Sequence, residues 1–279
     1  MATWNVENLS GTHGTSLFAG RSYERTERDY DALRKYVLET SADVVLLQEV
    51  ASPDAMRQIL PAKYHFFISS EYFKADPGES GIYTGIAYDP SAVRIINTVS
   101  IPTGITYQGT DGSQLRARDS VGIQVGWGEA RVWIVSVHLK SSCSNKSLPS
   151  SIKATDCGIL YQQLAVLRTW ITRLRADGSW VIIGGDFNRR GYPDYAQDPY
   201  LGLLDSAADA KRFARPDQRT CSTFDGNNRD PIDYFILFGL DNKRVQVKEL
   251  SIHERDLQAG FKLSDHCPVV LQVPASQVN

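Results

Sequence analysis

Residues that can bind a metal or move a proton adjoin several apolar, strand-like segments of this sequence. The clearest case is Gly184–Asn188, which follows the apolar run Trp180–Ile183 and places a carboxylate (Asp186) and a carboxamide (Asn188) at the end of a buried strand. Carboxylates are seldom fully buried without a partner. The segment therefore indicates a binding or catalytic site, with a simple polar turn as the alternative reading.

The same arrangement recurs at five other apolar segments. The side chains concerned are Asn5 with Glu7, Glu49, His138, Asp233, and Asp265 with His266. Each one alone has an ordinary structural explanation, such as a turn, an ion pair or a buried hydrogen-bond acceptor. Burying all of them without mutual compensation would be very costly, whereas convergence on a cation removes that cost.

The residue types narrow the chemistry further. Carboxylate and amide oxygens without cysteine suit the hard divalent ions Mg²⁺ or Mn²⁺, with Ca²⁺ as a third option. The two histidines add groups that can transfer protons. Together these residues predict metal-assisted hydrolysis of a phosphoester.

Composition sets only broad limits on function. The chain has 279 residues, a net charge of -2 and 42% hydrophobic residues, which is ordinary for a globular protein. No run of eighteen apolar residues occurs, so we expect no membrane span. Because there is no overall positive charge, a nucleic-acid partner would have to be attracted by local arginines, lysines or bound cations.

The predicted elements are many strands and a few helices. Strand-like runs are expected at residues 3–6, 44–47, 65–68, 85–88, 93–99, 120–125, 132–137, 181–183, 232–237, 245–250 and 268–273. Apolar residues at helical spacing predict helices at Arg25–Leu38 and Leu160–Leu174. This pattern indicates two packed sheets covered by helices, in one domain spanning residues 1–279.

The four cysteines point to an oxidising environment. Cys143 and Cys157 bracket a polar loop, and we predict that they form a disulfide. The pairing of Cys221 and Cys267 stays open, and four reduced thiols are the alternative. Since Met1 leads almost directly into the first predicted strand, we expect a secreted or periplasmic protein whose signal peptide has been removed.

Six motifs, in order along the chain, resemble the signatures of the endonuclease/exonuclease/phosphatase superfamily, also called DNase I-like. They are Trp4–Glu7, Leu47–Glu49, Val135–Leu139, Gly185–Asn188, Ile232–Tyr234 and Ser264–Pro268. The stretch from His138 to Asp186 is similar to secreted bacterial members in particular. The resemblance implies an α/β fold, a four-layer αββα sandwich of two mixed sheets flanked by helices, with the site at one edge of the sheets.

The resemblance also implies a metal centre and a water-activating group. Glu49 would be the principal metal ligand, helped by Asn5 and Asp265. Asp186 would orient or deprotonate the attacking water, and Asn188 would hold that water or a phosphate oxygen.

The remaining roles implied by the resemblance concern the substrate phosphate. His266, oriented by Asp233, would bind the phosphate or act as base, and His138 would contact the phosphate or protonate the leaving oxygen. Which histidine is acid and which is base stays open. Arg118 fits the position of a phosphate-binding arginine in DNase I-like nucleases, and Arg189 is expected to contact phosphate as well.

The chain departs from exonuclease III-like members at two positions. Glu7 replaces a shorter aspartate, which leaves direct or water-bridged metal ligation by this residue open. The tyrosine that those enzymes carry near the scissile phosphate has no secure counterpart, although Tyr107 is a candidate.

The shared core indicates a phosphoester but not which one. Arg189 and Arg190, directly after Asn188, suit a polynucleotide backbone. Sphingomyelinase-like members would be expected to carry an exposed hydrophobic loop that inserts into a membrane. Tyr72-Phe73 is a poor candidate for such a loop, because charged residues follow it at once. We therefore expect a monomeric, sequence-tolerant endonuclease acting on DNA and, as a further substrate, RNA. The alternatives are a sphingomyelinase-like phosphodiesterase or phosphatase on lipids or small molecules, a non-catalytic binding module, and terminal rather than internal cleavage.

Overall fold

Two mixed sheets of six strands form the centre of the protein. The computed structural model describes residues 1–17, 24–75, 81–109, 112–144, 155–190, 198–207, 211–214, 232–240 and 245–274. The first sheet has the order β13 (Gln246–Glu249), β14 (Val269–Gln272), β1 (Ala2–Leu9), β2 (Val44–Val50), β4 (Tyr83–Tyr88) and β3 (His65–Ile68). The second has the order β11 (Lys211–Ala214), β12 (Asp233–Phe238), β10 (Trp180–Asp186), β9 (Ala130–His138), β8 (Ser120–Trp127) and β5 (Arg94–Ile101).

A parallel pair of strands lies near the middle of each sheet. β1 pairs with β2 in parallel in the first sheet, and β9 pairs with β10 in parallel in the second. The other strand pairs of both sheets are antiparallel. The carboxyl ends of these four central strands therefore point toward the same region, where the polar motifs predicted from the sequence lie.

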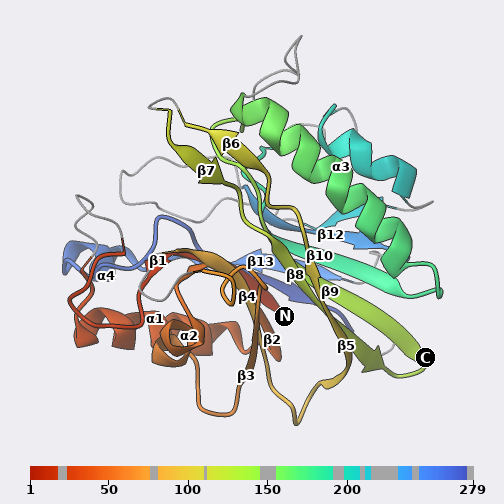
Figure 1. The fold of residues 1–279 in the computed structure, drawn as a ribbon. Helices are drawn as coiled ribbons and strands as arrows, with labels where there is room; N and C mark the ends of the chain where they lie inside the picture. The colour runs from red at the N-terminus through yellow and green to blue at the C-terminus, as the bar shows by residue number, and fades with distance from the viewer. Residues whose placement is uncertain are drawn as a thin grey trace.

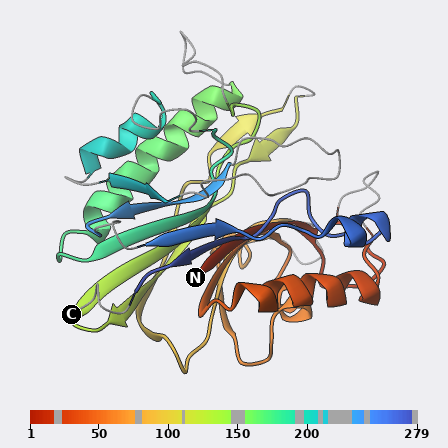
Figure 2. The same ribbon diagram turned by 180° about the vertical axis from the view of Figure 1, so that it is seen from behind.

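Helices cover the outer faces of both sheets, which makes four layers (Figures 1 and 2). Helices α1 (Glu27–Thr40) and α2 (Pro53–Ile59) lie against the first sheet, and α3 (Asp156–Leu174) with the 3-10 helix η2 (Leu201–Ala207) lies against the second. A short helix, α4 (Glu254–Gln258), lies at one end of the first sheet near α1. None of these helices is long and apolar enough to cross a membrane.

Alternation of side chains along the central strands builds three layers of core. On β2, Val45 and Leu47 pack in the core under α1 and α2, whereas Val44 and Leu46 pack in the core between the two sheets. Because both faces are covered, the strand reads as a continuous apolar run rather than an alternating one. The third core lies under α3. The predicted four-layer α/β sandwich is thus confirmed.

The structure contains all eleven predicted strands, and most extend further than expected. The predicted helix Arg25–Leu38 is α1, which starts and ends two residues later, and the helix predicted at Leu160–Leu174 begins four residues earlier, at Asp156. Several short elements were not predicted from the sequence. These are α2, α4, η2, β11, and a hairpin formed by β6 (Thr106–Gln108) and β7 (Gln114–Arg116). Each is too short, or too exposed, to show an apolar period.

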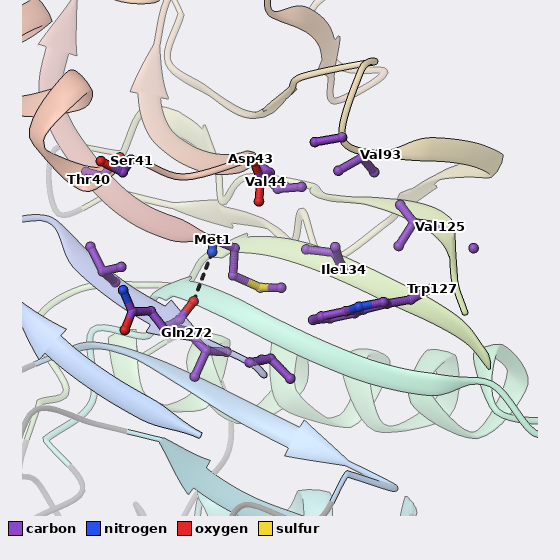
Figure 3. Close-up of a pocket in the computed structure, with 15 residues that line it drawn as sticks. Met1, Thr40, Ser41, Asp43, Val44, Val93, Val125, Trp127, Ile134 and Gln272 are labelled. Atoms are coloured by element: carbon purple, nitrogen blue, oxygen red, sulfur yellow. Dashed lines mark hydrogen bonds between the residues drawn. The ribbon is translucent and has the colours of Figure 1, made fainter. Parts of the chain in front are cut away.

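A cavity of about 340 Å³ lies between the sheets at the amino-terminal ends of β1 and β2 (Figure 3). Met1, Val93 and Trp127 are among the residues that line it. Asp43 is the only carboxylate in its lining. Since β1 and β2 start at this end and carry their polar motifs at the other, the cavity is remote from the acidic cluster described next.

Candidate active site

The polar motifs from distant parts of the chain meet at one edge of the paired sheets. In the second sheet, Asp186 is in register with His138 of β9 on one side and with Asp233 of β12 on the other. In the first sheet, Asn5 is in register with Gln48, the residue before Glu49. Strand pairing thus brings the motifs together within each sheet, and packing of the two sheets brings the two groups together.

Two glycines allow the chain to reach Asp186. Gly185 has a φ of +151°, and a Cβ atom there would lie 2.0 Å from the carbonyl oxygen of Val137. A Cβ atom on Gly184 would lie 2.4 Å from the ring of Phe235. No side chain fits at either position without displacing β9 or β12, which accounts for the Gly-Gly pair before Asp186.

Four residues of the site motifs have left-handed backbone conformations. The φ angles are 48° at Glu7, 53° at Asn8, 62° at Glu49 and 50° at Asn188. Such angles are unfavourable for residues with a Cβ atom, and they cluster where function requires a particular side-chain direction. Two of these positions, Glu49 and Asn188, are ones for which the sequence predicted a role at the site.

The carboxylates of Glu49 and Asp186 face each other across the amide of Asn5. The Asn5 Nδ2 atom lies 3.2 Å from Glu49 Oε1 and 3.1 Å from Asp186 Oδ2. The main-chain N–H of Asn8 donates to Glu49 Oε2 at 3.1 Å. Asn5 thus serves in this structure as a donor to both carboxylates, while its oxygen accepts a hydrogen bond from the N–H of Glu7.

His266 and Asp233 form a buried dyad. His266 Nδ1 lies 2.6 Å from Asp233 Oδ2, and the main chain of His266 is held by the indole N–H of Trp4, which donates to its carbonyl at 2.9 Å. Burial lowers the pKa of His266, but the Asp233 carboxylate outweighs burial and holds the pKa well above its usual value. His266 is therefore protonated at neutral pH.

The pKa of His138 is shifted in the opposite direction from that of His266. Burial and the positive charge of the nearby Arg118 lower the pKa of His138 to about 3. Its Nε2 atom lies 3.7 Å from both Glu49 Oε1 and Asp186 Oδ2. Its Nδ1 atom is buried and has no hydrogen-bond partner among the described residues. His138 is thus a neutral imidazole at pH 7, in contrast to His266.

Asp186 lies between the two histidines. Burial and the negative charge of Asp233 raise the pKa of Asp186 to about 6. Its Oδ1 atom accepts the main-chain N–H of Asn188 at 2.7 Å, and its Oδ2 atom lies 3.8 Å from His266 Nε2. A carboxylate whose pKa is near neutral is well suited to accept a proton from water.

The donor set fits a hard divalent cation. Asp186, Asp233 and His266 offer ligand atoms that all lie within 4.8 Å of one another. Because the facing atoms of Asp233 and His266 are already hydrogen-bonded, we favour the neighbouring space between Glu49 and Asp186. Burial and the charge of Asp233 disfavour ionisation of Asp186, and a cation beside it would offset both effects.

Asp265 and Glu7 lie on the outer side of this cluster. Asp265 Oδ1 is 3.7 Å from His266 Nε2, and 53% of the Asp265 side chain is exposed. The Oε2 atom of Glu7 accepts the main-chain N–H of Asp265 at 2.9 Å. Glu7, whose role the sequence left open, therefore connects the first motif to the last.

The two arginines expected at the phosphate occupy different environments. The guanidinium of Arg118 is half-buried, lies near His138 and has no hydrogen-bond or ion-pair partner among the described residues. It also lines a groove of about 680 Å³ that Tyr83 and Arg116 border. Arg189 is buried, with its Nε 2.8 Å from Asp198 Oδ2 and its Nη1 2.7 Å from the Cys143 carbonyl. Arg118 thus borders an open groove, whereas Arg189 connects two segments of the protein.

Tyr107 and the disulfide lie next to the segment that follows His138. The Tyr107 ring is 5.6 Å from Lys140 Nζ, which also contacts Asp156 at 2.7 Å. Cys143 and Cys157 form a disulfide, the pairing that the sequence predicted. Cys267 is also disulfide-bonded, and Cys221 lies outside the described residues.

Arg25 was not predicted to have a role at the site, yet it is 1% exposed and connects the first motif to the residues just before the last one. Its guanidinium donates to the carbonyls of Val6 at 2.8 Å and of Lys262 at 2.9 Å, and also to that of Leu263. An arginine just before a helix carries no sign of burial in the sequence, because the carbonyls that it meets come from distant segments.

Comparison with known proteins gives one family and several similar folds. The model of the Endonuclease/Exonuclease/phosphatase family matches residues 2–266. The solved structure of a humanized D. rerio TDP2 has a TM-score of 0.59 at 17% identity, covering 98% of this chain and 97% of that one. An endonuclease/exonuclease/phosphatase from Bacteroides vulgatus has a TM-score of 0.61 at 14% identity, with 98% of each chain covered. The mannosyl-6-phosphatase Bt3783 of Bacteroides thetaiotaomicron has a TM-score of 0.61 at 15% identity, with 97% of each chain covered. No curated protein matched the chain.

Proposed function

The chain belongs to the endonuclease/exonuclease/phosphatase family, and we propose that it is a divalent-metal phosphodiesterase that cleaves DNA internally with little sequence preference. Members of the family are phosphoester hydrolases, so the chain is an enzyme of this class. Metal dependence is consistent with the family and with the acidic and histidine side chains at the site. The substrate and the identity of the metal belong to the proposal.

We assign the cation to Glu49, in the space between this side chain and Asp186, with Asp265 and Glu7 on the solvent side and Asn5 as either a ligand or a donor to the carboxylates. When bound, Mg²⁺ or Mn²⁺ would stabilise the negative charge that develops on the phosphate oxygens during attack. The site residues do the rest by orienting the substrate and moving protons.

Asp186 accepts the proton of the attacking water, because its raised pKa gives it useful basicity near neutral pH. Asn188 helps to orient that water or a phosphate oxygen, since one amide proton remains after Nδ2 donates to the Leu139 carbonyl at 2.8 Å. The protonated His266, fixed by Asp233, donates to a phosphate oxygen, and the neutral His138 contacts the phosphate from the other side.

The observation that carries the choice of a diester is the charge of the site. Its carboxylates are Glu7, Glu49, Asp186, Asp233 and Asp265. The cationic side chains that face the phosphate are Arg118 and protonated His266. A phosphomonoester carries about -1.5 to -2 charges at neutral pH, whereas a diester carries one. A site this acidic therefore accommodates a diester more easily than a monoester.

DNA is the diester we favour. The groove beside Arg118 offers space for the chain that flanks a scissile phosphate, and Lys74 borders it with positive charge, whereas Arg116 is paired with Glu71, which also lines the groove. One similar structure is that of D. rerio TDP2 in complex with a single-strand DNA product, with a TM-score of 0.57 at 17% identity. RNA, whose backbone carries the same phosphodiester, is the second nucleic-acid substrate of this proposal.

Small-molecule or lipid phosphoesters, as in the sphingomyelinase branch, are the alternative substrates. The burial of Arg189 favours them, because one of the two arginines that suggested a polynucleotide is engaged with Asp198 instead. The similar mannosyl-6-phosphatase, which has this fold, is named for activity on a sugar phosphate.

We further propose a single domain over residues 1–279, a monomer, and a secreted or periplasmic location. The family match over residues 2–266 supports the first of these, and the Cys143–Cys157 disulfide is compatible with the last.

The test compares three substrates in parallel, with and without EDTA: supercoiled plasmid DNA, bis(p-nitrophenyl) phosphate and sphingomyelin. We expect metal-dependent nicking of the plasmid, loss of activity in His266→Ala, and full activity in the matched control His65→Ala on the edge strand β3. Cleavage of the small diester or sphingomyelin without plasmid nicking would replace the nuclease proposal with the alternative. Inactivity toward all three would contradict the proposed phosphodiesterase.

A further inference from the structure

A fully buried glutamine on α3 connects two segments that border the active site. Gln163 has 0% exposure, and its neighbours on the buried face of the helix are Leu160, Leu164 and Leu167. A polar side chain within an apolar helix face requires hydrogen-bond partners, because an unsatisfied buried amide is destabilising. The identity of these partners shows what the residue does.

Both partners of Gln163 are main-chain groups. Its Oε1 atom accepts the N–H of Lys140 at 2.8 Å, and its Nε2 atom donates to the carbonyl of Thr103 at 3.1 Å. Since an N–H can only donate and a carbonyl can only accept, these two bonds determine the orientation of the amide. Gln163 therefore spans the segment after β9 and the segment after β5.

The first of these segments carries one side of the catalytic centre. Lys140 follows His138 by two residues, and the intervening Leu139 donates its N–H to the Asp186 carbonyl at 2.9 Å. The carbonyl of Leu139 accepts Nδ2 of Asn188 at 2.8 Å. A shift of Lys140 would consequently be transmitted to His138 and Asn188.

The second segment carries Arg118. The hydroxyl of Thr103 donates to the Arg118 carbonyl at 2.9 Å and lies 2.8 Å from the hydroxyl of Ser120. Thr103 is itself buried, with 0% exposure. The position of the Arg118 backbone therefore depends on Thr103, which is bound to Gln163.

We propose that Gln163 is a positioning residue that fixes Arg118 relative to His138 and Asn188, so that all three can contact one phosphate. This inference rests on the proposed function, because it assumes that Arg118 binds the substrate phosphate. Arg118 contributes substrate binding rather than proton transfer, so a loss of its alignment raises KM more than it lowers kcat.

The test replaces Gln163 by methionine, which keeps the volume and removes both hydrogen bonds. Gln124→Met is the matched control: Gln124 is also buried, accepts from Asn97 Nδ2 at 2.9 Å and donates to Ser179 Oγ at 3.0 Å. Gln124 lies on β8 toward the end of the sandwich remote from the site, opposite Trp133 rather than His138. Comparing the two variants separates a loss of alignment from a general loss of packing.

For bis(p-nitrophenyl) phosphate we expect Gln163→Met to raise KM on the order of tenfold with a smaller change in kcat, because misalignment of a positioning contact has effects of this size. Gln124→Met should leave both constants unchanged. Thr103→Val, which removes only the hydroxyl bonded to the Arg118 carbonyl, should reproduce the rise in KM. It also keeps the test decisive if Gln163→Met does not fold.

The double variant Arg118→Ala/Gln163→Met tests the route of the effect. If Gln163 acts through Arg118, the double variant has the KM of Arg118→Ala alone, whereas a further rise overturns the proposal. An unchanged KM in both Gln163→Met and Thr103→Val overturns it as well. If Arg118→Ala itself has no effect on KM, the assignment of Arg118 to the phosphate fails instead.

A measurement without turnover keeps the two proposals separate. The ¹⁵N heteronuclear NOE of the Arg118 amide reports the order of this segment in the free protein. It should fall in Gln163→Met and Thr103→Val and stay unchanged in Gln124→Met. Unchanged order at Arg118 in both site variants contradicts the positioning role, even if the enzyme is inactive toward the diester.

Discussion

His266 Nδ1 lies 2.6 Å from Asp233 Oδ2, in a pair that joins the two sheets: Asp233 begins β12 of the second sheet, and His266 precedes β14 of the first. The pair sets the charge of the imidazole and directs its other nitrogen toward Asp186. The first two predictions follow from this relationship and from its contrast with His138.

Replacing Asp233 by Asn should lower the pKa of His266, because the carboxylate that outweighs burial is removed. At pH 7 the imidazole then becomes mostly neutral, and kcat should fall by about 10²- to 10⁴-fold. An NMR titration of the His266 Cε1 proton in EDTA-treated wild-type and variant protein measures the shift. An unchanged His266 titration curve would show that Asp233 does not control its charge.

His138 should not titrate between pH 5 and 8 in the metal-free protein. Burial and Arg118 lower its pKa to about 3, so the neutral form persists throughout this range. The same NMR experiment distinguishes it from His266. In Arg118→Ala the pKa of His138 should rise, because a nearby positive charge is removed. If His138 of the wild-type protein titrates between pH 5 and 8, the assigned electrostatics are contradicted.

Replacing Glu49 by Gln should weaken the response to a divalent cation while leaving the protein folded. If Glu49 is a metal ligand, MnCl₂ raises the melting temperature of the wild-type protein by binding the native state, and the rise is smaller in the variant. Asp54→Gln, a change at an exposed carboxylate on α2, is the control. Equal stabilisation of Glu49→Gln and wild type by the ion would exclude Glu49 as a ligand.

Removing the disulfide by replacing Cys143 and Cys157 with Ala should destabilise the protein. The bond closes a loop of 14 residues, for which the chain-entropy estimate is about 3 kcal/mol. Urea unfolding of the oxidised wild type and of the double variant gives the difference in the free energy of unfolding. Equal midpoints of unfolding would show that the disulfide does not stabilise the protein.

Asp29 should stabilise the protein only above acidic pH. Burial opposes its ionisation, but hydrogen bonds from the amides of Thr26 and Lys262 outweigh burial and lower the pKa of the carboxyl. A lowered native-state pKa adds stability above the unfolded-state value, and this stability is lost as the pH falls through the native-state value.

Asp29→Asn should therefore cost about 1 kcal/mol at pH 7, the usual contribution of a helix cap. The difference should shrink at acidic pH, as the wild-type carboxyl takes up a proton. Urea midpoints measured across this pH range test the expectation, and a difference that stays constant down to acidic pH would contradict it.

The sequence was informative where a polar residue follows a buried strand. Glu49, His138 and Asp186 could be identified because an apolar run ending in a potential ligand is unusual for a purely structural element. The strands themselves were recognisable from their runs of apolar residues. Helix α2, with only seven residues, has no clear period and was missed.

Pairings made by distant side chains could not be read from the sequence. Arg189 stands beside Asn188 and invited a role at the phosphate, yet its partner Asp198 and the Cys143 carbonyl are brought to it only by folding. Gln163 left a weak signal, a polar residue within the apolar face of a predicted helix. Nothing in that pattern shows which main-chain groups it would meet.

The left-handed backbone at Glu49 and Asn188 matters for attempts to make this enzyme more heat-resistant. Glycine at either position would relieve an unfavourable torsion, which is worth about 1 kcal/mol or more, but would delete a side chain to which the proposed mechanism gives a role. A screen that ranks variants by melting temperature alone will thus enrich inactive protein at these two codons. Higher thermal stability is better sought by filling the cavity beside Trp127, at the opposite end of the sandwich.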